Sequence, residues 1–320
     1  MKIRRHLVVA LWVFLLLIGI LLFLWTFRSV PFDEIVRVLT SLKPWEILVL
    51  LLVNISILLI APLRWWLILR AQGHSISYLA LAGYRQTASA VSYFTPGQNF
   101  GGEPVQVLAL RKHHKVSGSA ALAAVTLDRA VEWIGNLVVL IFGIAFVIST
   151  GMVTGFELQS PLLVAIAFPL FLIVYLITLR SGTHLFARLL KRFKGNLVAG
   201  LRSAEEQLGD LIRQQPGLFA GGLACSALVW IALFFEFWLA LDYLGLRLDP
   251  NQLILVVTAG RVALLAPTPG ALGALEASQL LAVQALGFDP AYGLSLGLLI
   301  RARDILFAVV GLMLGGLGLR

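Results

Sequence analysis

The sequence predicts an all-α polytopic membrane protein, and three observations lead to this fold class. The 320 residues are 59% hydrophobic and only 13% charged, whereas soluble domains are about a quarter charged. Several apolar runs reach the roughly 20 residues that an α-helix needs to cross a bilayer. Two further apolar segments are broken by proline and glycine, which favours hairpins that enter and leave the membrane on one side. We expect about six full spans and two re-entrant hairpins in a single transmembrane domain over residues 1–320.

The full spans are expected at the longest apolar runs. The first run follows a basic start and extends from Leu7 to Phe27 without a small-residue cleavage site, so we expect a retained span rather than a signal peptide. Five further runs meet the length criterion, at about 45–69, 118–149, 160–180, 217–244 and 290–317. The two broken segments, at about 80–111 and 251–287, are the expected re-entrant hairpins.

Positive charge indicates the orientation of these spans. When both broken segments are treated as re-entrant, most loop lysines and arginines fall on one side, and such residues gather in cytoplasmic loops. We therefore expect a protein of the inner membrane with both termini in the cytoplasm. Residues 181–216 are expected to form a basic, amphipathic cytoplasmic connection. The same topology accounts for the formal net charge of +9 without a nucleic-acid partner.

Two sequence features recur at almost the same spacing. Thr95-Pro96-Gly97 and Thr268-Pro269-Gly270 are 173 residues apart, and an arginine followed three residues later by an acid recurs after 172 residues. We interpret this as an internal duplication, with a first repeat over 45–149 and a second over 217–317. Because three spans separate equivalent elements, the second repeat is expected to be inverted. Many transporters with alternating access have this architecture.

Charged side chains inside the expected spans are the candidate binding residues, because ionisable groups are costly in a bilayer. Arg129 lies three residues before Glu132, so both share one helix face and can form an ion pair. Arg301 is expected to pair with Asp304 in the same way. Such a pair either locks two helices together or lets the guanidinium bind a phosphate. The candidate headgroup-binding residues are Arg129, Arg301, Glu132, Asp304, Asp128 and Arg303, with Glu236 as a secondary candidate.

The two breaks supply candidate gate residues. Glycine and proline at a break let backbone amides face a cavity, and the helix expected to start near Gly102 attracts anions at its N-terminus. Glu103 and Glu276 either cap the helices that follow, carry a proton, or meet a cationic headgroup. The candidate gate residues are Thr95, Pro96, Gly97, Gly102, Glu103, Thr268, Pro269, Gly270, Gly273 and Glu276.

Other motifs have structural interpretations. The stretch from Gly293 to Gly297 matches a hydrolase nucleophile elbow, but that motif needs a strand-to-helix turn. Inside an apolar span, its glycines and those at Gly311 and Gly315 are expected to allow close helix packing. Arg64, beside two tryptophans, is expected to snorkel to the membrane interface. The sequence has neither a nucleotide-binding motif nor a metal-ligand pattern, so we expect no cofactor, no metal and no catalytic residue.

The motifs at the two breaks resemble those of a known family. They begin with Phe94-Thr95-Pro96-Gly97 and continue to Gly102-Glu103. The other matching stretches are Leu110-Arg111-Lys112, Thr126-Leu127-Asp128-Arg129, Pro269 to Glu276, Leu286-Gly287 and Arg301. Over nearly the whole chain, the sequence resembles the family named for the transmembrane region of lysylphosphatidylglycerol synthase. One departure is Gln106, which stands near a position where the family often has an arginine, and it affects the expected charge preference for the headgroup.

This resemblance implies a flippase-like protein. In the best-known family member, the region is joined to a soluble aminoacyl-transferase domain. Because the chain ends at Arg320, we expect that domain and its aminoacyl transfer to be absent. Other relatives are stand-alone membrane proteins linked to glycolipid, isoprenoid-lipid or hopanoid pathways.

The leading hypothesis is therefore lipid translocation across the inner membrane. The expected substrate is an amphiphilic lipid with an anionic phosphate headgroup, either a phospholipid or a lipid-linked glycan. One alternative is a membrane-embedded glycosyl or lipid transferase with Asp128, Glu103 or Glu276 as its base. The other alternative is a non-catalytic scaffold subunit that binds lipid-synthesis enzymes. The sequence leaves the lipid, the direction, the energy source and the oligomeric state open.

Overall fold

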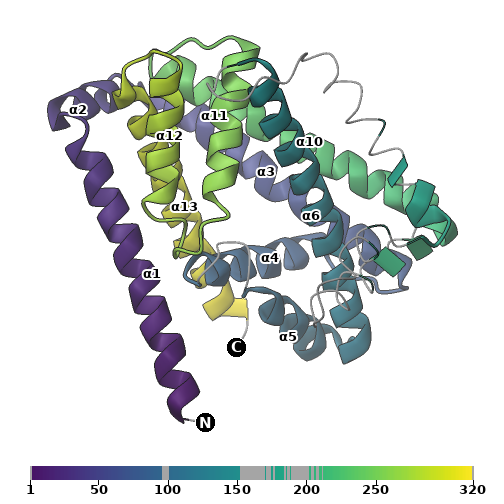
Figure 1. The fold of residues 1–320 in the computed structure, drawn as a ribbon. Coiled ribbons are helices and arrows are strands. Elements are labelled where there is room, and N and C mark those ends of the chain that lie inside the picture. The colour runs from purple at the N-terminus through teal and green to yellow at the C-terminus, as the bar shows by residue number, and fades with distance from the viewer. Residues whose placement is uncertain are drawn as a thin grey trace. The chain divides into compact units, whose positions relative to one another are not determined.

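A computed structural model describes residues 2–95, 101–151 and 212–318, together with individual positions between 170 and 210. The regular secondary structure in these residues is α-helical, as the sequence predicted (Figure 1). The helices are α1 (Lys2–Arg28), α2 (Phe32–Thr40), α3 (Pro44–Ala71), α4 (Tyr78–Tyr93), α5 (Glu103–His114), α6 (Gly118–Ser149), α10 (Pro216–Tyr243), α11 (Pro250–Ala263), α12 (Ala274–Ala285) and α13 (Pro290–Gly318). Most of the expected span at 160–180 and of the basic connection at 181–216 lies outside the described residues.

Three of the described helices are long and apolar enough to cross a membrane. These are α3, α6 and α10, and α1 with α2 makes a fourth candidate if the pair, bent by 86° at their junction, is counted as one span. Helix α13 also covers its expected span, but Arg301, Arg303 and Asp304 interrupt its apolar stretch. The described residues therefore account for three or four of the six full spans that the sequence predicted.

The chain divides into two compact units. The first contains Met1–Leu58, Ala82–Gln106 and Ala232–Arg320, and the second contains Leu59–Leu81 and Val107–Ile231. Helices α3 and α10 are each divided between the two units, α3 after Leu58 and α10 after Ile231. Both helix breaks belong to the first unit.

In the first unit, α11 and α12 form a helical hairpin within the second broken segment (Figure 1). Helix α11 begins at a capping box, in which Asp249 accepts the N–H of Gln252 and the Gln252 side chain accepts the Asp249 N–H. The two helices fold back on each other, and Gln279 on α12 donates to the carbonyl oxygen of Val256 on α11 at 3.3 Å. The second broken segment is thus a helix, a break of ten residues and a second helix.

The first hairpin consists of α4 and the start of α5. A β-carbon at Gly102 would lie 2.1 Å from the carbonyl oxygen of Ala88, so only glycine lets the chain approach α4 here. The Gly102 N–H donates to Ser92 Oγ at 3.0 Å, which fixes the start of α5 against α4. Pro96 and Gly97, which the sequence placed at the centre of this break, lie outside the described residues.

Helix α13 packs on the second hairpin through closely spaced small residues. A β-carbon at Gly293 would lie 2.3 Å from the carbonyl oxygen of Gln279, and one at Gly297 would lie 3.2 Å from the Cα of Glu276. These glycines are one helical turn apart, so they form one face on which α12 lies. The packing role predicted for this glycine motif is confirmed.

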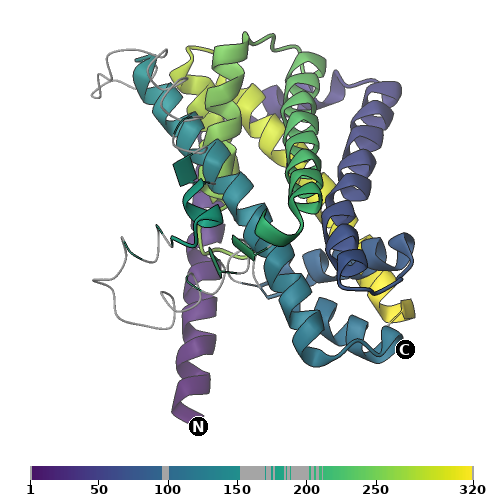
Figure 2. The same cartoon turned by 90° about the vertical axis from the view of Figure 1, so that its right-hand side faces the viewer.

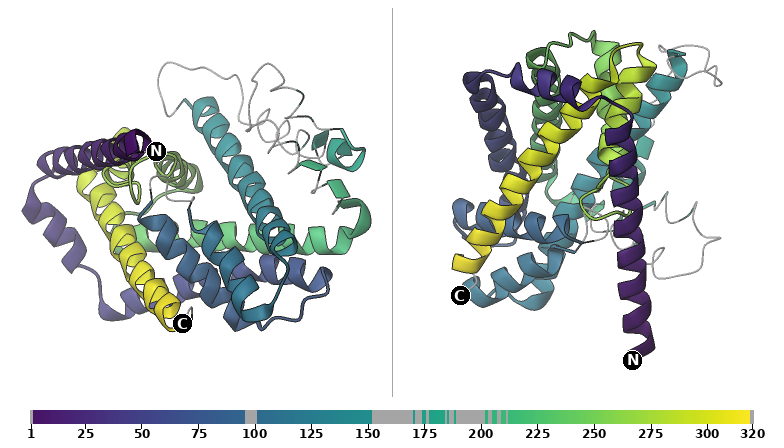
Figure 3. Two further views of the ribbon diagram at one scale, coloured as in Figure 1. Left: turned by 90° about the horizontal axis from the view of Figure 1, so that it is seen from below. Right: turned by 90° about the vertical axis from the view of Figure 1, so that its left-hand side faces the viewer.

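The other end of α13 packs on the first hairpin in the same manner (Figures 2 and 3). A β-carbon at Gly311 would lie 2.5 Å from the carbonyl oxygen of Gln86, and one at Gly315 would lie 2.4 Å from Thr87 Cγ2. Hydrogen bonds reinforce this contact, because Gln86 Nε2 donates to the Phe307 carbonyl at 2.8 Å and Thr87 Oγ1 to the Gly311 carbonyl at 3.1 Å. Helix α13 is therefore the common partner of both broken hairpins.

Helix α1 packs against the second break at Gly273. This residue has a φ of +75°, and a β-carbon there would lie 2.3 Å from the carbonyl oxygen of Gly19 on α1. Replacing Gly273 with alanine is expected to lower the free energy of unfolding by about 2–5 kcal/mol, from left-handed backbone strain and from overpacking. Thermal unfolding of the purified protein in detergent measures this loss.

Gly287→Ala is the matched control for this substitution. Gly287 has a φ of +81°, but apart from its chain neighbours no atom of the residues that the structure describes lies within 4 Å of a β-carbon built there. Its replacement is expected to cost only the strain, about 1–2 kcal/mol. Equal losses for the two variants would contradict the tight contact between α1 and the break.

Candidate functional site

Arg301, in the middle of α13, connects the two helix breaks. Its Nε and Nη2 donate to Glu276 Oε1 and Oε2 at 2.8 and 3.0 Å. Nη1 donates to Tyr93 Oη at 3.1 Å and to the carbonyl oxygen of Gly270, and Nη2 also donates to the carbonyl oxygen of Ala271 at 3.3 Å. A guanidinium has five N–H donors. Arg301 is 8% exposed and uses all five within the protein.

The acceptors of Arg301 come from both hairpins. Tyr93 is the last residue of α4, whereas Gly270 and Ala271 lie in the break between α11 and α12. Glu276 is fully buried and also accepts the N–H of Gly273 at 2.9 Å, so it caps α12 and pairs with the arginine at once. A fully satisfied network of this kind offsets the cost of burying two charges.

This arrangement corrects the ion pair that the sequence predicted. Asp304 was expected to pair with Arg301, but Asp304 Oδ1 accepts from Arg303 Nη2 at 2.8 Å and from Nε at 3.0 Å. The carboxylate that Arg301 binds is Glu276, which the sequence placed among the gate residues. The i,i+3 spacing does put Asp304 on the same face of α13 as Arg301, but the guanidinium binds a carboxylate of the neighbouring helix α12 instead.

A second polar cluster surrounds Arg303 in the same unit. Arg303 Nη1 donates to Glu236 Oε1 and, at 3.1 Å, to Asn54 Oδ1. Asn54 Nδ2 in turn donates to Glu236 Oε1 at 3.0 Å. Glu236, the secondary candidate, is therefore joined to one of the predicted headgroup-binding residues. Asn54 was missed, although a polar side chain inside an apolar span is itself a signal.

The second unit has a charged cluster of its own, centred on Arg64 of α3. Arg64 Nε donates to Asp128 Oδ1 at 2.7 Å, and Nη1 donates to Ser226 Oγ at 2.8 Å. Nη2 donates to Glu132 Oε2 at 3.3 Å. The same oxygen accepts from Arg129 Nη1 at 3.0 Å, so the predicted pair of Arg129 and Glu132 is confirmed.

The position of Arg64 contradicts its predicted role as an interfacial anchor. Its residue surface is 5% exposed, Asp128 is 1% exposed, and Trp65 is completely buried. Gly222 of α10 makes room for the arginine, whose Cγ lies 3.4 Å from a β-carbon built there. The overlooked signal is the distance of Arg64 from the end of α3. Arg70 lies in the last turn of this helix, whereas Arg64 lies almost two turns before the end.

The remaining gate residues hold the ends of the helices that flank the breaks. Glu103 Oε2 accepts the Gly101 N–H at 2.9 Å at the start of α5, which corresponds to the capping interpretation. Thr95 Oγ1 donates to the Ser92 carbonyl at 2.9 Å at the end of α4. Thr268 Oγ1 donates to the Leu272 carbonyl at 3.2 Å inside the second break, and Pro269 follows it in the chain. Each of these three hydrogen bonds joins residues no more than four positions apart in the chain.

Long apolar helices, two helix breaks and buried ion pairs define an α-helical integral membrane protein. Within that class, the chain belongs to the family described as lysylphosphatidylglycerol synthase TM region, whose profile matches residues 11–311. This confirms the resemblance inferred from the motifs at the breaks.

Two archaeal relatives are similar to the chain. A UPF0104 membrane protein of Methanothermobacter thermautotrophicus is 26% identical over 277 residues, which are 80% of either chain. A second UPF0104 membrane protein, from Methanocaldococcus jannaschii, is 25% identical over 166 residues, which are 51% of this chain and 48% of the relative. No solved structure matches the chain.

Proposed function

We propose that the protein translocates an amphiphilic lipid with an anionic phosphate headgroup between the two leaflets of the inner membrane. The observation that carries this proposal is the set of five hydrogen bonds from buried Arg301 to groups of both broken hairpins. Transporters place substrate sites where discontinuous helices meet. A buried arginine at such a place is a binding residue by default.

Arg301 can act by exchanging one partner for another. Glu276 presents two oxygens to the guanidinium, and a phosphate presents the same fork of acceptors. A headgroup that displaces Glu276 binds the guanidinium that also donates hydrogen bonds to the carbonyl oxygens of Gly270 and Ala271. Occupation of the site and the conformation of the second break are then coupled. Any acyl chain that the protein does not itself bind stays in the bilayer while the headgroup passes.

The proposal includes the predicted topology, with six spans, both termini in the cytoplasm and a second repeat inverted relative to the first. The helix pairs α4–α5 and α11–α12, each interrupted at its Thr-Pro-Gly stretch, support this arrangement. So does the shared contact of both pairs with α13. Arg129, with Glu132 as its partner, is the proposed headgroup-binding residue of the second unit.

Leaflet exchange of headgroup-labelled lipids in liposomes tests this function. The purified protein is reconstituted, and an impermeant quencher reports the labelled lipid in the outer leaflet. Wild type is expected to accelerate exchange of phosphatidylglycerol. Arg301→Lys keeps the charge but not the bidentate fork, so its rate is expected to fall at least about tenfold.

Arg247→Lys is the matched control, because the Arg247 side chain is 90% exposed in a loop. Its exchange rate is expected to equal that of wild type. Wild-type protein that exchanges no anionic or zwitterionic lipid would refute translocation of these lipids and favour the transferase or scaffold alternative. Exchange that survives Arg301→Lys unchanged would remove the arginine from the mechanism.

A further inference from the structure

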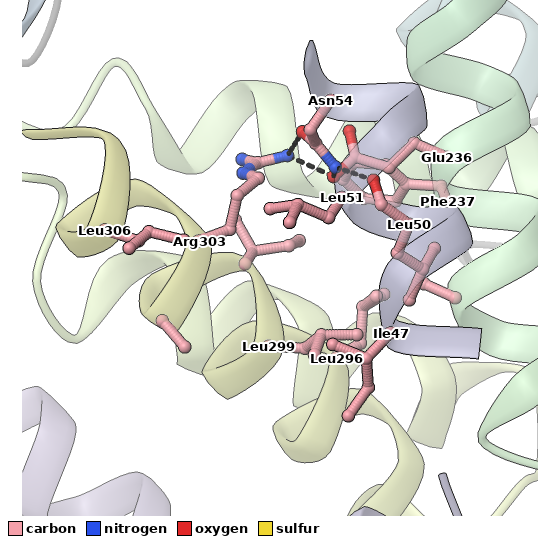
Figure 4. Close-up of a pocket in the computed structure, with 13 residues that line it drawn as sticks. Ile47, Leu50, Leu51, Asn54, Glu236, Phe237, Leu296, Leu299, Arg303 and Leu306 are labelled. Atoms are coloured by element: carbon pink, nitrogen blue, oxygen red, sulfur yellow. Dashed lines mark hydrogen bonds and ion pairs between the residues drawn. The ribbon is translucent and has the colours of Figure 1, made fainter. Parts of the chain in front are cut away.

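A cavity of about 180 Å³ lies in the first unit beside the Arg303 cluster (Figure 4). Ten of its thirteen lining residues are apolar, contributed by α3, α10 and α13. Ile47, Leu296 and Leu299 are among those that line its apolar end. An apolar cavity of about 150 Å³ stays dry and binds small hydrocarbons. The apolar end of this cavity therefore suits a hydrocarbon rather than water.

The three polar residues of the cavity gather at its other end. Figure 4 shows Asn54, Glu236 and Arg303 directed toward one another there. Asn54 and Glu236 are buried, whereas the Arg303 side chain is 21% exposed. A ligand that enters with its chain among the leucines thus brings its polar end to a guanidinium.

Arg303 differs from Arg301 in its supply of donors. It makes four hydrogen bonds, two to Asp304 and one each to Asn54 and Glu236. Among the residues that the structure describes, the second Nη2 hydrogen has no acceptor. A guanidinium with five donors therefore retains one for a ligand oxygen.

We propose that this cavity binds the hydrocarbon chain of a membrane lipid whose phosphate oxygen accepts a hydrogen bond from Arg303. The assignment rests on the proposed function and adds to it a separate place for one chain of the lipid. The chain is either an acyl chain of a glycerophospholipid or an isoprenoid chain, since both combine an aliphatic chain with a phosphate. Arg301 and Arg303 then have different roles. Arg301 must break its hydrogen bonds to Glu276 before it binds a headgroup, whereas Arg303 can bind a phosphate oxygen and keep its four hydrogen bonds.

Photo-crosslinking in lipid nanodiscs tests the cavity. The probes are phosphatidylglycerol with a diazirine in one acyl chain, a diazirine-labelled farnesyl phosphate, and diacylglycerol with the same labelled chain and no phosphate. Mass spectrometry locates the adducts after illumination. Adducts of one phosphate probe are expected on lining residues such as Leu50, Phe237 and Leu299, and the successful probe identifies the type of chain. The diacylglycerol is expected to label them about tenfold less, since it lacks the charge-assisted bond to Arg303.

Ala302→Phe is the variant that fills the cavity. Ala302 lines the cavity but is exposed, so a larger side chain is tolerated by the fold and is expected to cut labelling of the lining residues about tenfold. Val309→Phe adds the same ring at a position of α13 that is 42% exposed and does not line the cavity, and it is expected to change nothing.

The outcomes separate the cavity from translocation, because labelling does not require exchange. Labelled lining residues in a protein that exchanges no lipid would support the cavity and refute the proposed function. Adducts confined to outward-facing residues such as Met313 and Leu314, or labelling unchanged in Ala302→Phe, would overturn the cavity even if exchange is fast. Equal labelling by diacylglycerol would overturn the role of Arg303.

Discussion

Arg301→Ala is expected to destabilise the protein by about 3–5 kcal/mol and to abolish lipid exchange. The substitution leaves Glu276, at 0% exposure, without its guanidinium partner. It also removes the N–H groups that donate to the carbonyl oxygens of Gly270 and Ala271. Buried polar groups without partners are costly because water cannot replace the lost bond. Thermal or denaturant unfolding in detergent measures the first effect, and the liposome assay measures the second.

A double variant distinguishes a structural role from a functional one. In Arg301→Met with Glu276→Met, both charges leave together, and replacing a buried ion pair by apolar groups is often neutral or stabilising. The double variant is expected to recover the part of the stability that Arg301→Ala loses through the unpaired Glu276 carboxylate, but none of the exchange. The hydrogen bonds of Gly270, Ala271 and Gly273 to the two side chains are absent from it. Recovery of both stability and exchange would mean that the pair only holds α13 to the second break.

Arg64→Ala is expected to cost about 3–5 kcal/mol in the second unit. It leaves Asp128, which is 1% exposed, without the Nε donor at 2.7 Å, and it also removes the donor to Ser226. The measurement is again the unfolding of the purified variant in detergent. An arginine at the membrane interface would lose far less, so the magnitude itself checks the buried position.

Arg202→Ala is the control for this prediction. Arg202 pairs with Glu206 at 3.0 Å, but the two side chains are 65% and 49% exposed. Exposed pairs contribute about 0.2–1 kcal/mol. If Arg64→Ala and Arg202→Ala destabilise the protein equally, the cluster around Arg64 does not hold the helices of its unit together.

The helices could be predicted closely from the sequence because length and hydrophobicity determine them. The bounds of α3, α6 and α10 differ from the predicted spans by no more than two residues, since each is one long run in which apolar residues greatly outnumber charged ones. The two broken segments were found because proline and glycine cannot continue a helix without cost. The glycines of α13 were assigned to packing because their spacing puts them on one helix face.

The partners of the buried arginines could not be predicted in the same way. Spacing along one helix gives only the neighbours within that helix, which favoured Asp304 for Arg301. The partner Glu276 lies 25 residues away on α12, and Arg64 meets Asp128 from another helix 64 residues away. Which side chain a guanidinium meets depends on how two helices are rotated against each other, and the sequence pattern contains no measure of that rotation.

The contact between Gly19 and Gly273 gives a measure of depth in the bilayer. Helix α2 is bent by 86° from α1, the orientation of a helix on the membrane surface when α1 stands upright. Gly19 lies nine residues before Arg28, the end of α1, and a helix rises about 14 Å over this length. Half of the hydrocarbon core is about 15 Å thick. If α1 stands upright with Arg28 at the membrane surface, the start of α12, with the carboxylate that Arg301 binds one turn further on, is expected near the middle of the bilayer, about equally far from its two surfaces.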